Sequence, residues 1–374
     1  MAKHENTLKT PTRRQVARRA KEEKLNRILV WSAIGVVAVV LLVIGYGVIT
    51  ELVIKARKPV ARVDGVAITT QQFQQRLYYQ RLMMRQQLYD YQNYLTQIDT
   101  TDETMQSFFQ QVQSMATNLQ NQLSASSASV LGKQVLDYML EEEVVRKEAQ
   151  TRNLTVSQDD LTLAIEQVVG YDRAAAETVT DTTKIESFEE RYENLKENYL
   201  KPSRFSEQDF RTMVETSLLR EQLVGIIGAD IPQTSDQVDP IIFAVDSDET
   251  GMGLRERIEN GEDPTGLIVE VNNDESEQTA GYALGWVPAG YLGGQLGAEI
   301  EQVIFNTPVG KAAEPTLGSD GFYYVIYING HEERPVDAAT MQQMREDQYN
   351  SWLEPQKQER WEYLDWQTAV LTAP

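Results

Sequence analysis

The chain has 374 residues, of which 41% are hydrophobic and 24% are charged, and its formal net charge is −21. This length predicts two or three folded units, and the composition is that of a globular protein rather than a fibrous or wholly disordered one. The chain contains no cysteine, and its two histidines are His4 and His331. The sequence therefore excludes disulfides, thiolate zinc sites, cysteine nucleophiles and a lipid-modified cysteine, and it argues against histidine-based metal sites and triads.

Charge is distributed unevenly along the chain. Residues 1–27 carry nine Lys and Arg against three Glu, a charge of +6, so the remainder of the chain carries −27. A basic arm can bind nucleic acid, but phosphate backbones repel a body as acidic as this one. The sequence therefore predicts that nucleic acid is not a partner.

An uncharged run of 22 residues, 28–49, follows the basic arm directly. At ~1.5 Å per residue, a helix of this length crosses a bilayer core of roughly 30 Å. Trp31 and Tyr46 stand near its ends, as interfacial aromatic residues do, and the basic flank predicts a cytoplasmic N-terminus. The alternative is a cleaved signal peptide, which would have a shorter apolar region and a small-residue cleavage site. We expect a single-pass anchor in the cell membrane at 28–50 and an extracytoplasmic body.

Three short motifs predict the starts of helices. Each places Ser or Thr three residues before Gln or Asp, with apolar neighbours, and they begin at Thr69, Ser157 and Ser206. A fourth motif at Thr234 lacks the apolar pair and is a weaker signal. Apolar residues recur at helical spacing after these caps, so residues 64–228 are predicted to be mainly helical.

Many Tyr and Met residues fall on the first predicted helix. They are most simply core and rim residues. The alternative is that some line an adaptable apolar surface for unfolded chains, to which thioethers and amphipathic rings are suited. These residues are Tyr78, Tyr79, Met83, Met84, Tyr89, Tyr91 and Tyr94.

The pattern changes near residue 230, where short apolar runs replace long helical ones. They predict a compact α+β domain of about one hundred residues, after which a helical pattern returns from Pro335. So apolar a tail is expected to pack on the helical domain. The predicted strands are 241–245, 282–287 and 323–328, and the predicted helices between them are 254–258 and 300–305.

The α+β region contains Gly281-Tyr282-Ala283-Leu284-Gly285, then a helical segment at 299–305 and a strand that starts near Gly321. In order and spacing these segments resemble the parvulin family of peptidyl-prolyl cis-trans isomerases, also called rotamases. Residues 60–69, residues 140–160 and the helix after Ser206 resemble the helical chaperone domain of membrane-anchored and periplasmic foldases that carry parvulin modules.

The resemblance implies an α+β fold in which a mainly helical chaperone domain is completed by the C-terminal helix and interrupted by a parvulin-like domain. The expected parts are a basic cytoplasmic arm at 1–27, a transmembrane helix at 28–50, a helical chaperone domain at 51–232, a parvulin-like domain at 233–336 and a C-terminal helix at 337–374 that packs on the helical domain.

The resemblance also implies a reaction in which an X-Pro amide is rotated through a barrier of roughly 18–20 kcal/mol, without covalent intermediate, metal or cofactor. The family places two histidines and an Asp or Cys on the floor of its site. In this sequence the histidine positions fall on or near Ile242 and on Tyr323, and the acidic position falls on Asp274. Asp274 and Tyr323 are therefore the candidate catalytic residues, although a tyrosine cannot reproduce the paired imidazole network.

Apolar residues are implied to hold the proline ring of a substrate. These candidate substrate-binding residues are Val287, Leu296, Ile300 and Phe305. A second alignment of the loop at 289–298 uses Leu292 in place of Leu296. The alternative interpretation is that these side chains are ordinary core.

We therefore expect a membrane-anchored, extracytoplasmic foldase and chaperone of the parvulin class. Its partners would be unfolded, newly exported polypeptides and their proline-containing segments, and its isomerase activity would be weak or lost. One alternative is a competent isomerase that tolerates the substitutions. Another is a structural or assembly partner of the secretion machinery or the cell envelope.

Overall fold

A computed structural model describes four long stretches of the chain and three isolated positions in the N-terminal region. These are residues 54–98, 103–178, 186–273 and 279–370, with Trp31, Val37 and Val40. The anchor predicted at 28–50 thus lies outside the described residues, apart from the three isolated positions. Within the described part of the chain, no helix combines the length and the apolar character that crossing a membrane requires.

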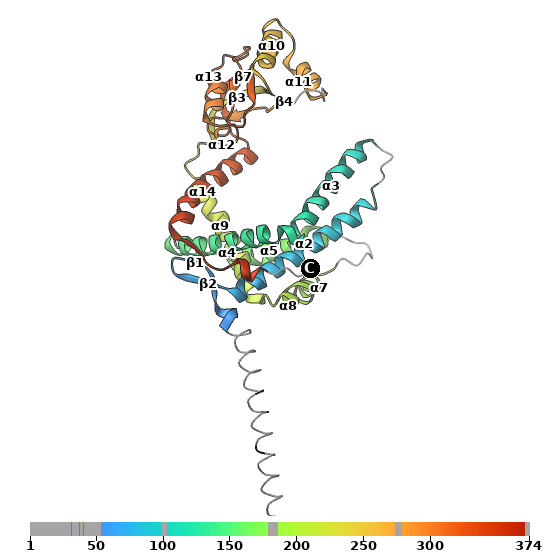
Figure 1. Cartoon of the computed structure of the whole chain (residues 1–374), viewed down its shortest axis with the longest axis vertical. Coiled ribbons are helices and arrows are strands. Elements are labelled where there is room, and N and C mark those ends of the chain that lie inside the picture. The colour runs from blue at the N-terminus through green and yellow to red at the C-terminus, as the bar shows by residue number, and fades with distance from the viewer. Residues whose placement is uncertain are drawn as a thin grey trace, which may run out of the picture. The chain divides into compact units, whose positions relative to one another are not determined.

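The chain forms two compact units. Unit 1 consists of Met1–Leu218 and Arg360–Pro374, and unit 2 consists of Leu219–Glu359. Unit 1 is mainly helical and unit 2 combines a sheet with helices (Figure 1). A mainly helical α+β architecture is therefore confirmed. The predicted division into 51–232, 233–336 and 337–374 remains a proposal.

Unit 1 contains a small sheet and most of the helices. Its strands are β1 (Pro59–Val63), β2 (Val66–Thr69) and β8 (Trp361–Tyr363), in the order β2-β1-β8. Its helices are α2 (Thr70–Leu95), α3 (Glu103–Gln122), α4 (Ala128–Thr151), α5 (Gln158–Val168), α6 (Arg173–Thr178), α7 (Phe188–Leu195), α8 (Lys201–Ser203) and the first part of α9 (Glu207–Ile227). Short helical turns occur at η2 (Ala125–Ser127), η3 (Lys196–Leu200) and η4 (Gln367–Ala369).

The sheet of unit 1 joins segments from both ends of the chain. A two-residue turn, Asp64-Gly65, connects β1 to β2, and both residues have positive φ, as tight hairpins require. Strand β8 pairs antiparallel with β1, with Val63 opposite Trp361. The C-terminal helix predicted over 337–374 therefore requires correction: α14 (Ala338–Arg360) ends at Arg360, because the next residues extend to pair with β1.

Helix starts follow the capping chemistry of the sequence. At Thr69 the hydroxyl accepts from the backbone N–H of Gln72, and the Gln72 side chain accepts from the backbone N–H of Thr69. The hydroxyls of Ser157 and Ser206 likewise accept from the backbone N–H groups three residues on. These three predictions are confirmed. The weaker one at Thr234 is wrong, because that segment pairs with a neighbouring strand instead.

Unit 2 is built on an antiparallel sheet. Its strands are β3 (Thr234–Val245), β4 (Ala280–Ala283), β5 (Val287–Pro288), β6 (Thr316–Leu317) and β7 (Tyr323–Pro335), in the order β4-β3-β7-β6, with β5 also paired to β3. Its helices are the second part of α9, α10 (Asp248–Glu259), α11 (Pro264–Asn273), α12 (Gly293–Leu296), α13 (Ala298–Asn306) and most of α14. The single strand predicted at 282–287 is divided into β4 and β5 by a turn at Gly285, whose φ is +70°.

Helices cover both faces of this sheet (Figure 1). On one face Ile242 and Ile326 pack with Ile300 and Ile304 of α13. On the other face a separate cluster contains Phe243, Val325 and residues of α10 and α11. Strands β3 and β7 are therefore apolar at consecutive positions rather than at alternate ones.

Candidate functional site

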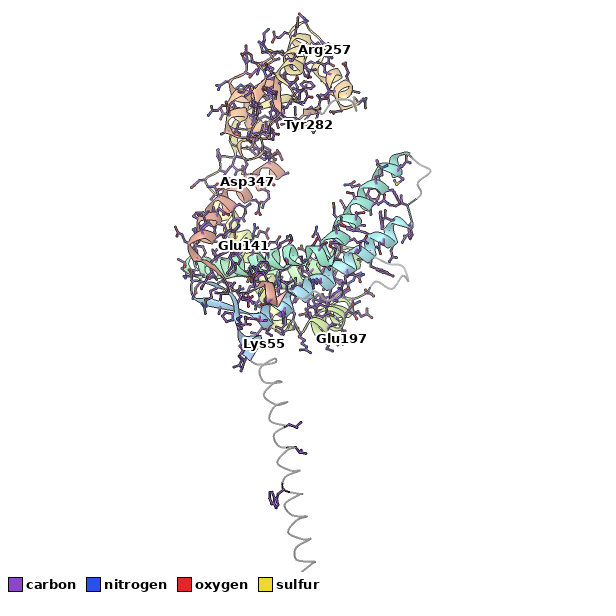
Figure 2. The ribbon with its side chains drawn as sticks, in the orientation of Figure 1. Lys55, Glu141, Glu197, Arg257, Tyr282 and Asp347 are labelled. Carbon is purple, nitrogen blue, oxygen red and sulfur yellow. The ribbon has the colours of Figure 1, made fainter. Side chains whose placement is uncertain are left out.

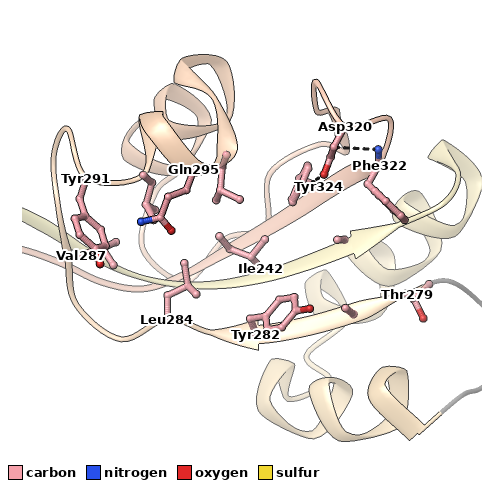
Figure 3. A pocket seen from close by; sticks show the side chains of 14 residues that line it. Ile242, Thr279, Tyr282, Leu284, Val287, Tyr291, Gln295, Asp320, Phe322 and Tyr324 are labelled. Atoms are coloured by element: carbon pink, nitrogen blue, oxygen red, sulfur yellow. Dashed lines mark hydrogen bonds between the residues drawn. The ribbon is translucent and has the colours of Figure 1, made fainter. Parts of the chain in front are cut away.

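A cavity of about 620 Å³ lies on the face of the unit 2 sheet that carries α12 and α13 (Figure 3). Its volume is in the range of pockets that bind small ligands. The lining is mainly apolar and aromatic. It comprises Ile242, Ala244, Thr279, Ala280, Tyr282, Leu284, Val287, Tyr291, Leu292, Gln295, Leu296, Asp320, Phe322 and Tyr324.

A hydrogen-bonded pair, Asp320 and Tyr324, forms one side of the cavity (Figure 3). The Tyr324 hydroxyl donates to Oδ2 of Asp320 at 2.7 Å, and the backbone N–H of Phe322 donates to Oδ1 at 3.2 Å. Burial, reinforced by the carboxylate, raises the pKa of Tyr324 to about 12, and the phenol lowers the pKa of Asp320. At neutral pH the carboxylate is therefore charged, and the phenol keeps its proton and donates a hydrogen bond to it.

A tight turn between β6 and β7 positions this pair. The backbone N–H of Gly318 donates to the carbonyl of Phe322 at 2.7 Å, and Gly321 has a φ of +91°. A side chain at residue 318 would clash with Tyr324, because its Cβ would lie 2.5 Å from a ring atom. Glycine at 318 therefore allows the tyrosine ring to pack beside Asp320.

The predicted substrate-binding residues separate into two groups. Val287 and Leu296 line the cavity, and so does Leu292, so both alignments of the loop bring a leucine to it. Ile300 is buried in the core cluster of the same face, and Phe305 packs at the edge of that cluster, with its ring 6.0 Å from that of His331. Neither Ile300 nor Phe305 is among the described residues that line the cavity.

The two candidate catalytic residues are not brought together at the cavity. Asp274 lies outside the described residues. Tyr323 packs in the cluster on the opposite face of the sheet, because it pairs with Val245, whereas Ile242 faces the cavity. The tyrosine at the cavity is the next residue, Tyr324.

The cavity contains polar and aromatic residues that were not predicted from the sequence as site residues. Asp320, Phe322 and Tyr282 are the most prominent of them. His331, the one histidine in the described part of the chain, lies elsewhere, with Nε2 2.9 Å from Oδ1 of Asp236. Among the described residues, no group of three or more His, Asp and Glu side chains is arranged to hold a metal ion.

No family model matches the chain. In sequence it is similar to the foldase protein PrsA of Geobacillus kaustophilus (strain HTA426), with 22% identity over 204 residues. The matched region covers 50% of this chain and 71% of that relative.

Several solved structures were also found. PrsA from Bacillus anthracis is 14% identical, with a TM-score of 0.36, and the match covers 60% of this chain and 96% of that one. PrsA from Streptococcus pneumoniae is 13% identical, with a TM-score of 0.27, and the match covers 64% of this chain and 82% of that one. A SurA-like chaperone structure from Campylobacter jejuni is 15% identical, with a TM-score of 0.22, and the match covers 62% of this chain and 88% of that one. The predicted resemblance is confirmed by the relatives found: in sequence the chain is similar, at low identity, to a PrsA foldase protein.

Proposed function

We propose that this protein is a membrane-anchored, extracytoplasmic foldase that binds unfolded, exported polypeptides and holds their proline-containing segments in the cavity of unit 2. The observation that carries the proposal is the open apolar cavity on one face of the sheet. The sequence relation to a foldase protein supports it independently.

The cavity suits a proline ring because most of the side chains that line it are apolar. Ile242 and Ala244 of β3 line it, and so do Val287, Leu292 and Leu296. Apolar contacts of this kind hold the ring in the planar and in the twisted amide with similar strength. Such uniform binding retains a substrate without accelerating its isomerisation. The proposed activity is therefore mainly binding, with weak isomerisation.

A helical hairpin in unit 1 is the proposed surface for unfolded chains. Helices α2 and α3 lie side by side (Figure 1), and Glu103 is the single charged residue in the sequence of α3. Five large apolar side chains are exposed along this hairpin. Their thioethers and aromatic rings give it a surface that can adapt to different apolar segments. These exposed residues are Tyr89, Tyr94, Met105, Phe108 and Met115.

The proposed anchor is the uncharged run at 28–49, with the basic arm in the cytoplasm. Protease added to intact cells, or to spheroplasts if an outer membrane is present, should remove residues beyond 60 and spare an N-terminal tag. A protected C-terminal tag would contradict this topology.

The cavity proposal is tested by titrating proline peptides into full-length protein with labelled methyl groups, in mild detergent. The methyl resonances of Ile242, Ala244 and Leu296 should shift in a saturable way. Leu296→Gln should weaken binding, whereas Val309→Gln, an exposed position of unit 2 outside the described cavity lining, should leave it unchanged. Titrations that leave all three methyl resonances unmoved would refute the assignment of this cavity.

A further inference from the structure

We propose that the cavity of unit 2 prefers polypeptide segments that carry Lys or Arg next to the residue it holds, and that Asp320 sets this preference. The inference rests on the proposed function and deepens it, because it names the chemical class of segment that the cavity selects.

The β-rich part of unit 2 is strongly acidic. Residues 234–335 contain nineteen Asp and Glu against four Lys and Arg, a net charge of −15. The net charge of the whole chain is −21, so this segment of about one hundred residues carries most of the net negative charge. A field of this sign attracts cationic segments and repels anionic ones over distances of about one Debye length, roughly 8–10 Å at physiological salt.

The four basic side chains of this segment have partners outside the cavity. Arg257 pairs with Glu262 and Glu270 at 2.6 and 2.7 Å. The Lys311 ammonium lies 3.4 Å from Glu259. None of the four is among the described residues that line the cavity, and Figure 2 shows Arg257 on α10, apart from Tyr282 on β4.

The other two basic side chains, Arg334 and Arg255, also have partners outside the cavity lining. The Arg334 guanidinium lies over the Trp286 ring at 4.3 Å from its centroid, and Arg255 donates from Nε to the carbonyl of Ala312 at 3.3 Å. The cavity therefore has no described cation of its own to neutralise a carboxylate within it.

Asp320 is the one charged side chain among the described residues that line the cavity, and it is exposed. Its two hydrogen bonds come from Tyr324 and from the backbone of Phe322, and both favour the ionised form. The rings of Phe322 and Tyr282 also line the cavity (Figure 3), and aromatic faces attract cations. A cationic side chain beside a bound proline therefore meets a carboxylate and two rings.

The expected preference is modest because Asp320 is exposed to solvent. Exposed ion pairs change affinity by at most about fivefold. The preference should weaken as salt is raised, because mobile ions screen an exposed pair.

The experiment compares three peptides of the form acetyl-Ala-Xaa-Pro-Phe-amide, with Lys, Gln or Glu at Xaa, on the full-length protein. Affinity is measured from the methyl resonances of Ile242, Ala244 and Leu296. The Lys peptide should bind about threefold to fivefold more tightly than the Gln peptide at low salt, and the Glu peptide should bind most weakly. Asp320→Asn should bring the Lys and Gln peptides to equal affinity, and Asp320→Glu should restore the difference.

Glu256→Gln is the matched control, because it removes one negative charge from an exposed position of α10 outside the described cavity lining. It should retain the preference. Equal binding of the Lys and Gln peptides to the unaltered protein would overturn this inference and leave the proposed function standing. Equal loss of preference in Asp320→Asn and Glu256→Gln would overturn the role of Asp320, and an absence of binding by every peptide would overturn both proposals.

Discussion

Arg360 binds Asp64, a residue 296 positions earlier in the chain, with Nε 2.9 Å from Oδ1. Lys147 of α4 donates to the same carboxylate at 2.6 Å. Asp64 occupies the tight turn between β1 and β2, and Arg360 immediately precedes β8. One carboxylate therefore connects the turn of the sheet, a helix and the returning end of the chain.

This ion pair predicts a pH dependence for the sheet of unit 1. Hydrogen bonding to Arg360 lowers the pKa of Asp64 from 3.8 to about 2. The folded protein thus favours the charged carboxylate, so the stabilisation is complete above about pH 4 and is lost as the pH falls from about 4 to about 2. Asp64→Asn keeps a residue that tolerates the positive φ and removes the charge. We expect it to lower the stability of the sheet by about 1 kcal/mol and to abolish this pH dependence.

Hydrogen exchange of the β1 and β8 amides measures the effect, and about 1 kcal/mol corresponds to exchange about fivefold faster. The matched control is Glu362→Gln, because Glu362 joins the same two strands through Arg62 at 3.3 Å but is well exposed. It should change exchange little. Identical protection in the Asp64→Asn and unaltered proteins would show that backbone pairing alone holds β8.

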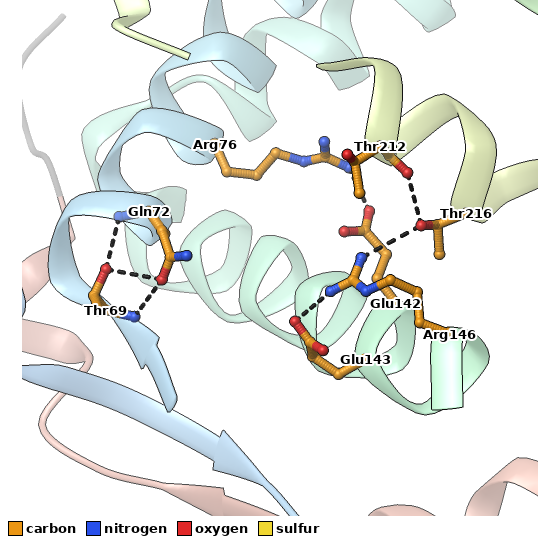
Figure 4. Close-up of polar contacts among 8 residues, drawn as sticks. All are labelled: Thr69, Gln72, Arg76, Glu142, Glu143, Arg146, Thr212 and Thr216. Atoms are coloured by element: carbon orange, nitrogen blue, oxygen red, sulfur yellow. Dashed lines mark hydrogen bonds and ion pairs between the residues drawn. The ribbon is translucent and has the colours of Figure 1, made fainter. Parts of the chain in front are cut away.

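A second charge pair, Arg76 and Glu142, lies between α2 and α4 (Figure 4). A guanidinium nitrogen of Arg76 lies 2.7 Å from Oε1 of Glu142. Both side chains are mostly buried, with 13% of Arg76 and 23% of Glu142 exposed. Beside them Arg146 pairs with Glu143 and donates to the Thr216 hydroxyl of α9 at 3.3 Å. Burial raises the pKa of Glu142 despite the neighbouring cations.

Arg76→Met should destabilise unit 1 by about 3 kcal/mol, because it leaves the Glu142 carboxylate buried without its partner. Since the pKa of Glu142 is raised in the folded protein, the loss should be largest at neutral pH and smaller in mild acid, where the carboxyl is protonated. Urea unfolding at several pH values, followed by helical circular dichroism, measures it. The double variant Arg76→Met with Glu142→Leu should recover most of the stability. A double variant as unstable as Arg76→Met would mean that packing of Arg76, rather than charge, dominates.

Helix starts could be predicted from the sequence because their cause is local. A cap at Ser157 needs only residues within one turn, and the same is true of Ser206. The C-terminal tail could not be predicted to the same depth. Whether its residues after Arg360 continue the helix or form β8 depends on β1, about three hundred positions away in the sequence.

The faces of β7 could not be predicted for a different reason. Tyr323 and Val325 face one cluster, whereas Tyr324 and Ile326 face the other, and all four are apolar or aromatic. A strand that is buried on both faces has no alternation of polar and apolar residues in its sequence. An alignment displaced by one residue therefore assigns each side chain to the wrong face without placing a polar residue in the core. Asp320 was missed because it lies in a turn and belongs to no periodic pattern.

The proposed role of the hairpin of α2 and α3 predicts that polar substitutions on its exposed surface reduce chaperone activity. Replacing Phe108 and Met115 with Gln should weaken the suppression of aggregation of a denatured client that lacks essential prolines, because the two side chains are 37% and 42% exposed and supply apolar contact. Their exposure means that fold stability should change by less than about 0.5 kcal/mol. Light scattering at several-fold molar excess measures the activity.

Leu163→Gln is the control for this prediction, because Leu163 is 42% exposed on α5, outside the hairpin. It should leave aggregation suppression unchanged. If it weakens suppression as much as the paired hairpin variant does, general surface hydrophobicity rather than the hairpin carries the activity.

The cavity itself predicts weak prolyl isomerisation, and the reason is one of magnitude. A thousandfold acceleration requires about 4 kcal/mol of stabilisation given selectively to the twisted amide. Such selectivity comes from oriented polar groups, each worth about 3–4 kcal/mol in a site that excludes water. No histidine is among the described residues that line this cavity, and the Tyr324 hydroxyl already donates its hydrogen bond to Asp320.

Turnover of a proline tetrapeptide in a protease-free assay should therefore be at least about tenfold below that of an intact parvulin measured in parallel. The Tyr324 hydroxyl already donates its hydrogen bond to Asp320 and so has none to give to the amide. Tyr324→Phe should therefore change this residual turnover by less than about twofold, even if it alters peptide affinity. Peptide contact, followed through the Ile242 methyl resonance, confirms that substrate reaches the cavity in the same samples. Robust turnover that disappears in Tyr324→Phe would instead mean that the phenol and the Asp320 carboxylate act together on the amide, in the role that histidines have in the family.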